Sequence, residues 1–245
     1  MRYLIISDLH ANRHALDAVL ADAAARGYDA TICLGDVVGY GGDPAATLDL
    51  TLALEPVGLI RGNHDKVCAG LEPATSFNDV ARRAVEWTRA ALSPAQVATL
   101  AALPRGPLRI TEDLEICHGA PFNEDFYVFD RNDASRALSS ASARICLFGH
   151  THLPAIYTTV GHPMEAALNG DPDERRLPRE GAVLINVGSV GQPRDGDPRA
   201  AYGLLDLERE TLQMRRVSYD VAGAQAAITA AGLPAWLARR LATGE

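Results

Sequence analysis

A short pattern recurs along this chain and limits what it can fold into: an apolar run is followed by glycine, Asp, Asn or His. Short apolar runs of about four to eight residues, bounded by glycine, are typical of buried β-strands. Polar residues just past such strands are candidates for a functional site, because open α/β sheets bind their ligands at the carboxyl ends of the strands. The pattern ends in Asp8-Leu9-His10, Gly35-Asp36, Gly62-Asn63-His64-Asp65, His118-Gly119 and Gly149-His150-Thr151-His152.

The first third of the chain alternates strands with helices. Asn12 is suited to cap a helix that ends at Gly27, and Asp43-Pro44 provides an N-cap and a first-turn proline for a second helix. The order strand, helix, strand predicts right-handed crossovers between parallel strands, so the polar residues that follow these strands line one edge of the sheet. The strands are expected at residues 3–6, 30–34 and 57–61.

The remainder of the chain predicts a helical cover and then a second sheet. Residues 77–103 are helical by composition, with Ser93-Pro94 restarting the helix, and show no catalytic pattern. Two short helices close the chain on either side of Gly232-Leu233-Pro234. Residues 161–181, rich in Pro, Asp, Glu and Arg, are expected to form an exposed loop or hairpin tip joining strands near residues 156 and 183. Further strands are expected at 108–110, 114–117, 145–148, 183–186, 201–206 and 212–218.

Size and charge exclude several classes of function. With 245 residues, 47% of them hydrophobic, the chain can form one domain spanning residues 1–245, and no linker interrupts it. The formal net charge is −8 without a Lys/Arg stripe, which argues against stable nucleic-acid binding. The first apolar run meets Asp8 before a signal-peptide core forms, and no stretch has the length of a membrane span, so we expect a cytoplasmic protein without a membrane partner. The four cysteines form no Cys-x-x-Cys pair and are interpreted as buried hydrophobic residues.

Five of the seven histidines follow predicted strands, which favours a metal centre over scattered structural histidines. Within Asp8-x-His10 and His150-x-His152, alternate side chains of an extended segment point the same way, so both members of a pair can reach one centre. The candidates outnumber the four to six ligands of a single ion. Two ions that share Asp36, one through each carboxylate oxygen, fit better. The candidate ligands are Asp8, His10, Asp36, Asn63, His118, His150 and His152.

The ligand types indicate which metals and which chemistry to expect. Nitrogen and oxygen ligands without thiolate suit manganese, our first choice, and also iron, zinc, cobalt or nickel. Two divalent ions carry more charge than Asp8 and Asp36 neutralise, so the centre attracts phosphate. Ions about 3.5 to 4 Å apart hold a bridging hydroxide that attacks a phosphoester. His64 is placed to give a proton to the leaving oxygen, and we expect Asp65 to hold the imidazole and raise its pKa.

Taken in their order along the chain, the strand-end motifs that begin at Asp8 and end at His152 resemble the signature of the calcineurin-like metallophosphoesterase superfamily. The chain matches this signature over residues 8–152. Gly39-Tyr40-Gly41 and the segment 186–194 resemble the small bacterial and archaeal phosphodiesterase branch. The resemblance implies a four-layer sandwich of two mixed β-sheets flanked by helices. It also implies His64 and Asp65 as the catalytic pair, and two metal sites. The first site would comprise Asp8, His10, Asp36 and His152, and the second Asp36, Asn63, His118 and His150.

Four further residues are candidate substrate contacts, each with a structural alternative. Tyr40 lines a pocket or packs over its turn, and Arg61 approaches phosphate or forms a salt bridge at the strand end. Ser189 and Arg194 reach the site or serve the turns of a glycine-rich segment.

Alternatives to a phosphodiesterase remain. One is a phosphoprotein phosphatase and another an enzyme acting on phosphomonoesters or dinucleoside polyphosphates, since all need the same metal core. A third is a non-catalytic scaffold of the same fold, although such scaffolds usually lose part of the histidine set. The His-x-His-x-Asp-His run of metallo-β-lactamases does not occur. The sequence indicates neither the physiological substrate nor the oligomeric state.

Overall fold

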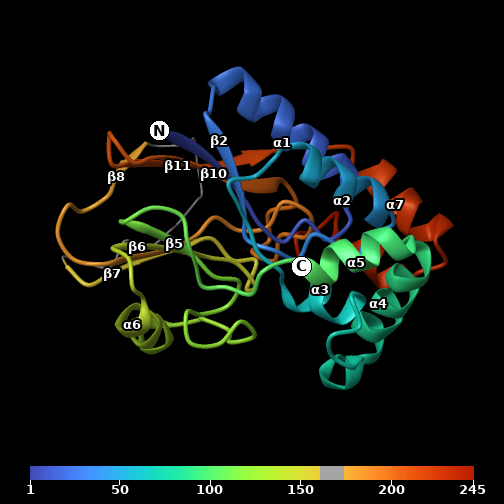
Figure 1. Ribbon diagram of the computed structural model, residues 1–245. Coiled ribbons are helices and arrows are strands. Elements are labelled where there is room, and N and C mark those ends of the chain that lie inside the picture. The colour runs from blue at the N-terminus through green and yellow to red at the C-terminus, as the bar shows by residue number, and fades with distance from the viewer. Residues whose placement is uncertain (161–173) are drawn as a thin grey trace.

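The computed structural model describes residues 1–160 and 174–245 and consists of two mixed β-sheets stacked face to face between helices (Figure 1). The strand order is β3-β2-β1-β10-β11-β8 in the first sheet and β4-β5-β6-β9-β7 in the second. This arrangement confirms the predicted four-layer α/β sandwich.

The first sheet contains the parallel strands predicted for the beginning of the chain. β1 (Arg2–Ile6), β2 (Ala30–Cys33) and β3 (Gly58–Leu59) run parallel, although β3 is shorter than expected. β10 (Ala200–Asp206) pairs antiparallel with β1, and β11 (Thr211–Val217) pairs with β10. The last long strands therefore return to the first sheet and place β1 at its centre.

The second sheet is built from shorter strands. β5 (Leu114–Ile116), β6 (Ile145–Phe148) and β9 (Val183–Asn186) are parallel neighbours. The antiparallel strands β4 (Leu108–Arg109) and β7 (Ala155–Thr158) form its two edges. In both sheets, the carboxyl ends of the parallel strands lead into the predicted site motifs.

The predicted loop at 161–181 is partly a strand. Residues 161–173 lie outside the described residues. Within the rest of this segment, β8 (Arg175–Arg176) pairs antiparallel with β11 of the first sheet. The strands on either side, β7 (Ala155–Thr158) and β9 (Val183–Asn186), pair antiparallel, as expected for a hairpin. The prediction is wrong for residues 175–176, which form a strand and pair with the opposite sheet.

Helices α1 (Arg13–Arg26) and α2 (Pro44–Ala53) lie on the outer side of the first sheet, α7 (Val221–Ala230) packs on α1, and α8 (Ala235–Arg240) packs on α7 (Figure 1). Asn12 caps α1 as predicted, because its side chain accepts a hydrogen bond from the Ala15 amide at 3.1 Å. Asp43 occupies the N-cap position of α2, but its side chain makes no capping hydrogen bond. Pro44, whose fixed backbone favours the first turn, is the stronger start signal.

The helical segment predicted at 77–103 forms α4 (Asp79–Ala91) and α5 (Pro94–Ala102), and Ser93 caps α5. These helices pack against α3 (Asn63–Cys68), which begins at the predicted site residue Asn63, and the 3-10 turn η1 (Ala74–Ser76) precedes them. On the second sheet lies α6 (Arg131–Ser140), which the sequence analysis did not identify (Figure 1). Asp130 caps it, because its side chain accepts hydrogen bonds from the Asn132 and Asp133 backbone amides.

Alternation of side chains along β1 divides the core into layers. Leu4 and Ile6 are packed with residues of the flanking helices, whereas Tyr3 and Ile5 are packed with residues of the second sheet. A third cluster lies between the second sheet and α6 and includes Cys146 and Phe148. Apolar packing on both faces thus fixes the two sheets relative to each other, and with them the strand ends that carry the site.

Candidate metal centre

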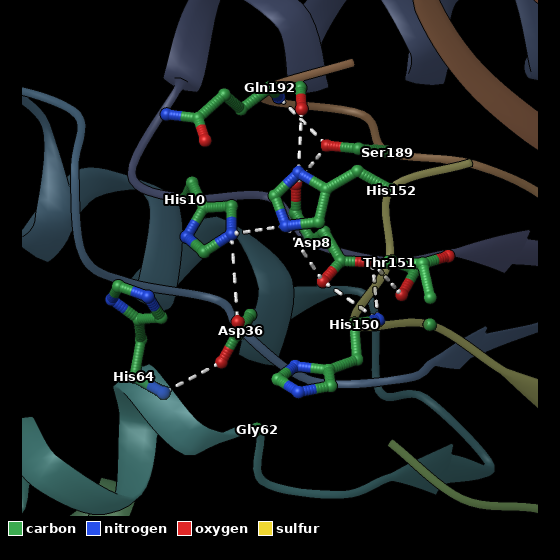
Figure 2. Close-up of polar contacts among 12 residues, drawn as sticks. Asp8, His10, Asp36, Gly62, His64, His150, Thr151, His152, Ser189 and Gln192 are labelled. Carbon is green, nitrogen blue, oxygen red and sulfur yellow. Dashed lines mark hydrogen bonds and ion pairs between the residues drawn. The ribbon is translucent and has the colours of Figure 1, made fainter. Parts of the chain in front are cut away.

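The seven strand-end candidates form two adjoining sets that share one carboxylate. In the first set, ligand atoms of Asp8, His10, Asp36 and His152 all lie within 4.8 Å of one another. In the second, ligand atoms of Asp36, His118 and His150 do so as well. Asn63 extends the second set, because its Oδ1 lies 3.3 Å from His118 Nε2. Figure 2 shows most of these side chains converging around Asp36.

Asp36 joins the two sets through a single oxygen. Its Oδ2 lies 3.5 Å from His10 Nε2 and 3.4 Å from His118 Nε2, between the two sets. Its Oδ1 instead accepts a hydrogen bond from the His64 backbone amide at 2.9 Å (Figure 2). The expectation that each carboxylate oxygen serves a different ion is therefore wrong, because one oxygen is used to anchor the start of α3.

The short pairs converge through tight turns rather than along an extended segment. Five of the nine non-glycine residues with positive φ among the described residues are candidate ligands, with φ between 46° and 67°. This region of backbone conformation disfavours L side chains, and residues held in it cluster at functional sites. Strand alternation is thus the wrong reason for the pairing. The five are Asp8, His10, Asp36, His150 and His152.

Hydrogen bonds to backbone carbonyls orient the imidazoles. The Nδ1 atoms of His10, His118 and His152 face the carbonyl oxygens of Val38, Leu34 and Gln192 at 3.3, 2.8 and 2.6 Å, respectively. Because a carbonyl only accepts, Nδ1 carries the proton and Nε2 presents its lone pair to the centre. His150 is reversed: its Nε2 faces the Asp125 carbonyl at 3.2 Å, which leaves Nδ1 as the free nitrogen.

This donor set fits divalent metal ions. His10 Nε2 and His152 Nε2 lie 3.1 Å apart, and both present lone pairs, so a cation between them removes a repulsive contact. Burial lowers the pKa of His118, but Asp36 and Asp8 more than offset this and raise it to about 10, because two buried carboxylates favour a positive charge beside them. Only nitrogen and oxygen atoms contribute, which suits a non-thiolate site.

Comparison with known proteins places this arrangement in a family. The sequence model of the calcineurin-like phosphoesterase superfamily domain matches residues 1–210. This chain belongs to that superfamily.

Individual relatives match over almost the full chain. An uncharacterised protein of Methanocaldococcus jannaschii is 33% identical over 98% of this chain and 97% of its own length. The crystal structure of a metallophosphoesterase from Sphaerobacter thermophilus is 36% identical, covers both chains completely and superposes with a TM-score of 0.87. A hypothetical protein from Pyrococcus horikoshii shares the fold, with a TM-score of 0.79 at 18% identity over 100% of this chain and 98% of its own. Among the described residues of this superfamily member, no helix combines the length and apolar character needed to cross a bilayer.

Asp8 is fixed by loops from both sheets. Its carboxylate accepts hydrogen bonds from Ser7 Oγ at 2.6 Å and from the His150 amide at 3.2 Å, and burial raises its pKa to about 6. The Ser189 hydroxyl donates to the Asp8 carbonyl and accepts from the Gln192 amide, both at 2.8 Å. Because Ser189 is fully buried, the prediction that it contacts substrate is wrong. It holds the first ligand loop instead.

Asp65 does not hold the His64 imidazole. Its carboxylate accepts hydrogen bonds from the Gly62 and Val38 backbone amides at 2.9 and 3.1 Å, and the bond to Gly62 caps the N-terminus of α3. His64 Nδ1 is buried and has no hydrogen-bond partner among the described residues. Burial lowers the pKa of His64 to about 4, the opposite of the predicted direction. The expected His64–Asp65 pair is therefore corrected: Asp65 positions the backbone next to Asn63 and His64.

The tyrosine and glycines beside the site pack around His64. The Tyr40 ring lies 4.8 Å from the His10 ring and 4.3 Å from the His64 ring, measured between centroids. Gly39 has φ 89°, and a side-chain carbon there would lie 2.5 Å from His64 Nδ1. At Gly62 the added carbon would overlap Asp36 Oδ1. Glycine is thus required at both positions for close approach of backbone to site side chains.

The two predicted arginine contacts differ. Arg61 donates twice to Glu124, at 3.1 Å each, so the structural alternative, a salt bridge at the strand end, describes its position. Arg194 lies beside the first set: its Cζ is 5.9 Å from the Tyr40 ring centroid and its Nη2 donates to Gln192 Oε1 at 2.9 Å. Its Nε is buried without a partner among the described residues. Arg194 therefore retains an unused donor near the centre.

Several residues that position the site were not found from the sequence. The Asn186 amide donates to the Gly149 carbonyl at 2.8 Å and to Thr151 Oγ1 at 3.0 Å, which fixes the loop between His150 and His152. The Gln192 carbonyl orients His152. Both belong to the glycine-rich segment 186–194, so its resemblance to a family was the available signal. No pattern marked Phe77 or Tyr127, which lie next to the centre.

Proposed function

We propose that this chain is a dinuclear metal-dependent phosphoesterase that hydrolyses phosphodiester bonds. The observation that carries the proposal is Asp36, whose Oδ2 lies between two buried nitrogen and oxygen sets. A shared carboxylate oxygen suits two adjacent ions, whereas a single structural ion needs only one set. Membership of the calcineurin-like phosphoesterase superfamily supports the same reaction class.

The first ion would be held by Asp8, His10, Asp36 and His152, and the second by Asp36, Asn63, His118 and His150. Two divalent ions supply charge for the phosphate oxygens and a hydroxide nucleophile near neutral pH. Manganese suits these oxygen and nitrogen ligands, and iron, zinc, cobalt or nickel are alternatives for the same donor set.

His64 is the group we assign to the leaving oxygen. Its ring lies 4.9 Å from the His10 ring, and its backbone amide is fixed by Asp36. The negative charge of a bound phosphoester would raise the pKa of His64, so that its imidazolium would donate a hydrogen bond to the leaving oxygen and pass it a proton as the bond to phosphorus breaks.

Arg194 and Tyr40 complete the phosphate side of the site. The unpartnered Nε of Arg194 gives a charge-assisted hydrogen bond to a phosphate oxygen, while Gln192 and the Tyr40 ring hold the guanidinium. Such a donor strengthens binding of an anionic substrate without taking part in bond cleavage.

The proposal is tested with purified protein loaded with manganese. We expect hydrolysis of an activated diester, bis(p-nitrophenyl) phosphate, at a rate that falls to background after chelation and returns when metal is restored. A panel of phosphomonoesters, dinucleoside polyphosphates and phosphopeptides then ranks the substrates. Protein that binds two ions but leaves the entire panel intact would overturn the proposal and favour a non-catalytic role.

A further inference from the structure

A cavity of about 330 Å³ opens beside the second ligand set. Asn63 and His150 belong both to this set and to the lining of the cavity. The volume lies in the range of small-molecule sites, which is about 300 to 1,000 Å³. A group attached to a phosphate at the centre can therefore extend directly into this space. The lining comprises Asn63, Lys66, Val67, Glu72, Ser76, Phe77, Asp125, Tyr127 and His150.

Aromatic rings form a surface that runs outward from the centre. The Tyr127 ring stacks on the His150 ring with centroids 3.8 Å apart. The Phe129 ring is parallel to Tyr127, with an interplanar angle of 2° and a centroid distance of 5.2 Å. Tyr127 and Phe129 nevertheless remain 42% and 60% exposed. The His150 and Phe129 rings lie on opposite faces of Tyr127, so the part of Tyr127 that stays exposed beside the cavity favours contact with a flat apolar partner, which removes that surface from water.

A second aromatic residue enters the cavity from a different part of the chain. Phe77, which directly follows η1, lines the same space, and its ring lies 4.8 Å from the His64 ring. The aromatic lining therefore reaches from the proposed proton donor to the second ligand set. A flat group bound here contacts rings supplied by the α3–α4 connection and by the segment that precedes α6.

The charges of the cavity disfavour a second phosphate. Lys66 Nζ lies 2.6 Å from Asp125, 3.1 Å from Glu72 and 3.5 Å from Glu124, so its charge is already neutralised. Among the charged lining residues, two carboxylates outnumber this one amine. The side chains of Glu72 and Asp125 remain 50% and 44% exposed and can accept hydrogen bonds from N–H groups. The cavity thus suits an uncharged group that carries such donors.

We propose that this cavity binds a nucleobase, or a similar flat heterocycle with N–H donors, that forms the organic part of the phosphoester. Contacts with the exposed part of Tyr127 and with Phe77 would hold the ring, and Glu72 and Asp125 would accept hydrogen bonds from its amino groups. The inference rests on the proposed function, since it assigns the rest of the substrate whose phosphate lies at the metal centre.

Two ligands that differ only in the base test the proposal. They are the phosphonate analogues of adenosine 5′-monophosphate and ribose 5-phosphate, in which a methylene group replaces the ester oxygen and prevents hydrolysis. Their dissociation constants are measured by calorimetry with manganese-loaded protein. We expect the adenosine analogue to bind about tenfold more tightly, on the scale of base–aromatic stacking. Equal affinities would overturn the proposal.

Substitutions in the cavity test whether its aromatic residues cause the preference for the adenosine analogue. Tyr127→Leu should bring the ratio of the two dissociation constants close to one, and Phe77→Leu should reduce it. Because the ratio is compared, any effect on metal binding through His150 cancels. Trp236→Leu is the matched control, since Trp236 is also 42% exposed but packs on Arg240 of α8. A ratio that survives both cavity substitutions would show that the base binds elsewhere.

The same measurements separate this inference from the proposed function. Binding of the phosphonates requires no turnover. A base preference in protein that hydrolyses no ester would support the cavity assignment and overturn the phosphoesterase. Hydrolysis of diesters by protein without a base preference would support the phosphoesterase and overturn the cavity assignment.

Discussion

The two ligand sets use similar side chains but differ in their surroundings. In the first, loop backbone encloses the ligands: Val38 and Gln192 orient the two histidines, and the Gly191 amide donates to the Asp8 carbonyl at 3.0 Å. In the second, His150 and Asn63 line a cavity of about 330 Å³. If the two sets bind metal as proposed, the second is the one that a substrate would reach through this cavity.

The charged residues beside the two ligand sets also differ. Arg194 keeps an unpartnered Nε next to the first set, whereas Lys66, near the second, is surrounded by carboxylates. An anionic group is therefore attracted to the side of the first set and an uncharged one to the cavity. We infer that this polarity would orient a substrate across the centre.

The largest effect is expected for Asp36→Asn, which removes the carboxylate common to both sets. Both ions should be lost at concentrations that saturate the wild type, and turnover should fall to background. Elemental analysis after gel filtration gives the stoichiometry. By contrast, His152→Ala should weaken only the first site and His118→Ala only the second. Loss of a single ion from Asp36→Asn would contradict the sharing of Asp36.

His64→Ala tests a residue that lies beside both sets and belongs to neither. Because the imidazole serves the leaving oxygen, turnover should fall by about 10² to 10⁴ while both ions remain bound. Activity is measured with bis(p-nitrophenyl) phosphate alongside metal content. His14→Ala is the control, since His14 is a partly exposed histidine near Asp220 and belongs to neither ligand set. Metal loss in His64→Ala would instead make His64 a support for the centre.

A smaller effect is expected for Arg194→Gln, which removes the cation beside the first set. Loss of one charge-assisted hydrogen bond should raise KM about tenfold with little change in kcat. Arg61→Gln is the comparison, because the guanidinium of Arg61 is already bound to Glu124. It should reduce the stability of the fold more than substrate affinity. Equal effects of the two substitutions on KM would contradict the proposed difference in charge between the two sides of the site.

Strand-end residues could be predicted from the sequence because a buried strand leaves a local signal. Apolar runs locate β1, β2, β5 and β6, and parallel order places the residues after them together. The partners of β10 and β11 could not be predicted in this way. Their pairing depends on contacts between distant segments, and an apolar strand suits either sheet.

Side-chain direction also limited the prediction of the site. Asp65 follows His64 directly, but in the first turn of α3 its carboxylate turns back to the Gly62 amide. Adjacent helical residues do not face each other, so sequence proximity was misleading. Tyr127 and Phe77 lie in irregular segments without periodicity, and only the folded chain brings them to the second set.

The position of β1 has a consequence for the order in which the protein is made. The loop that carries Asp8 is completed by hydrogen bonds from Val190 to Ser7 and from Gly191 to Asp8, and β1 itself pairs with β10. These partners leave the ribosome long after Asp8 does, because synthesis proceeds from the N-terminus. A nascent chain that stops between residues 153 and 189 contains all seven candidate ligands yet lacks the segments that shape their loops. Premature termination therefore releases a product without an assembled centre.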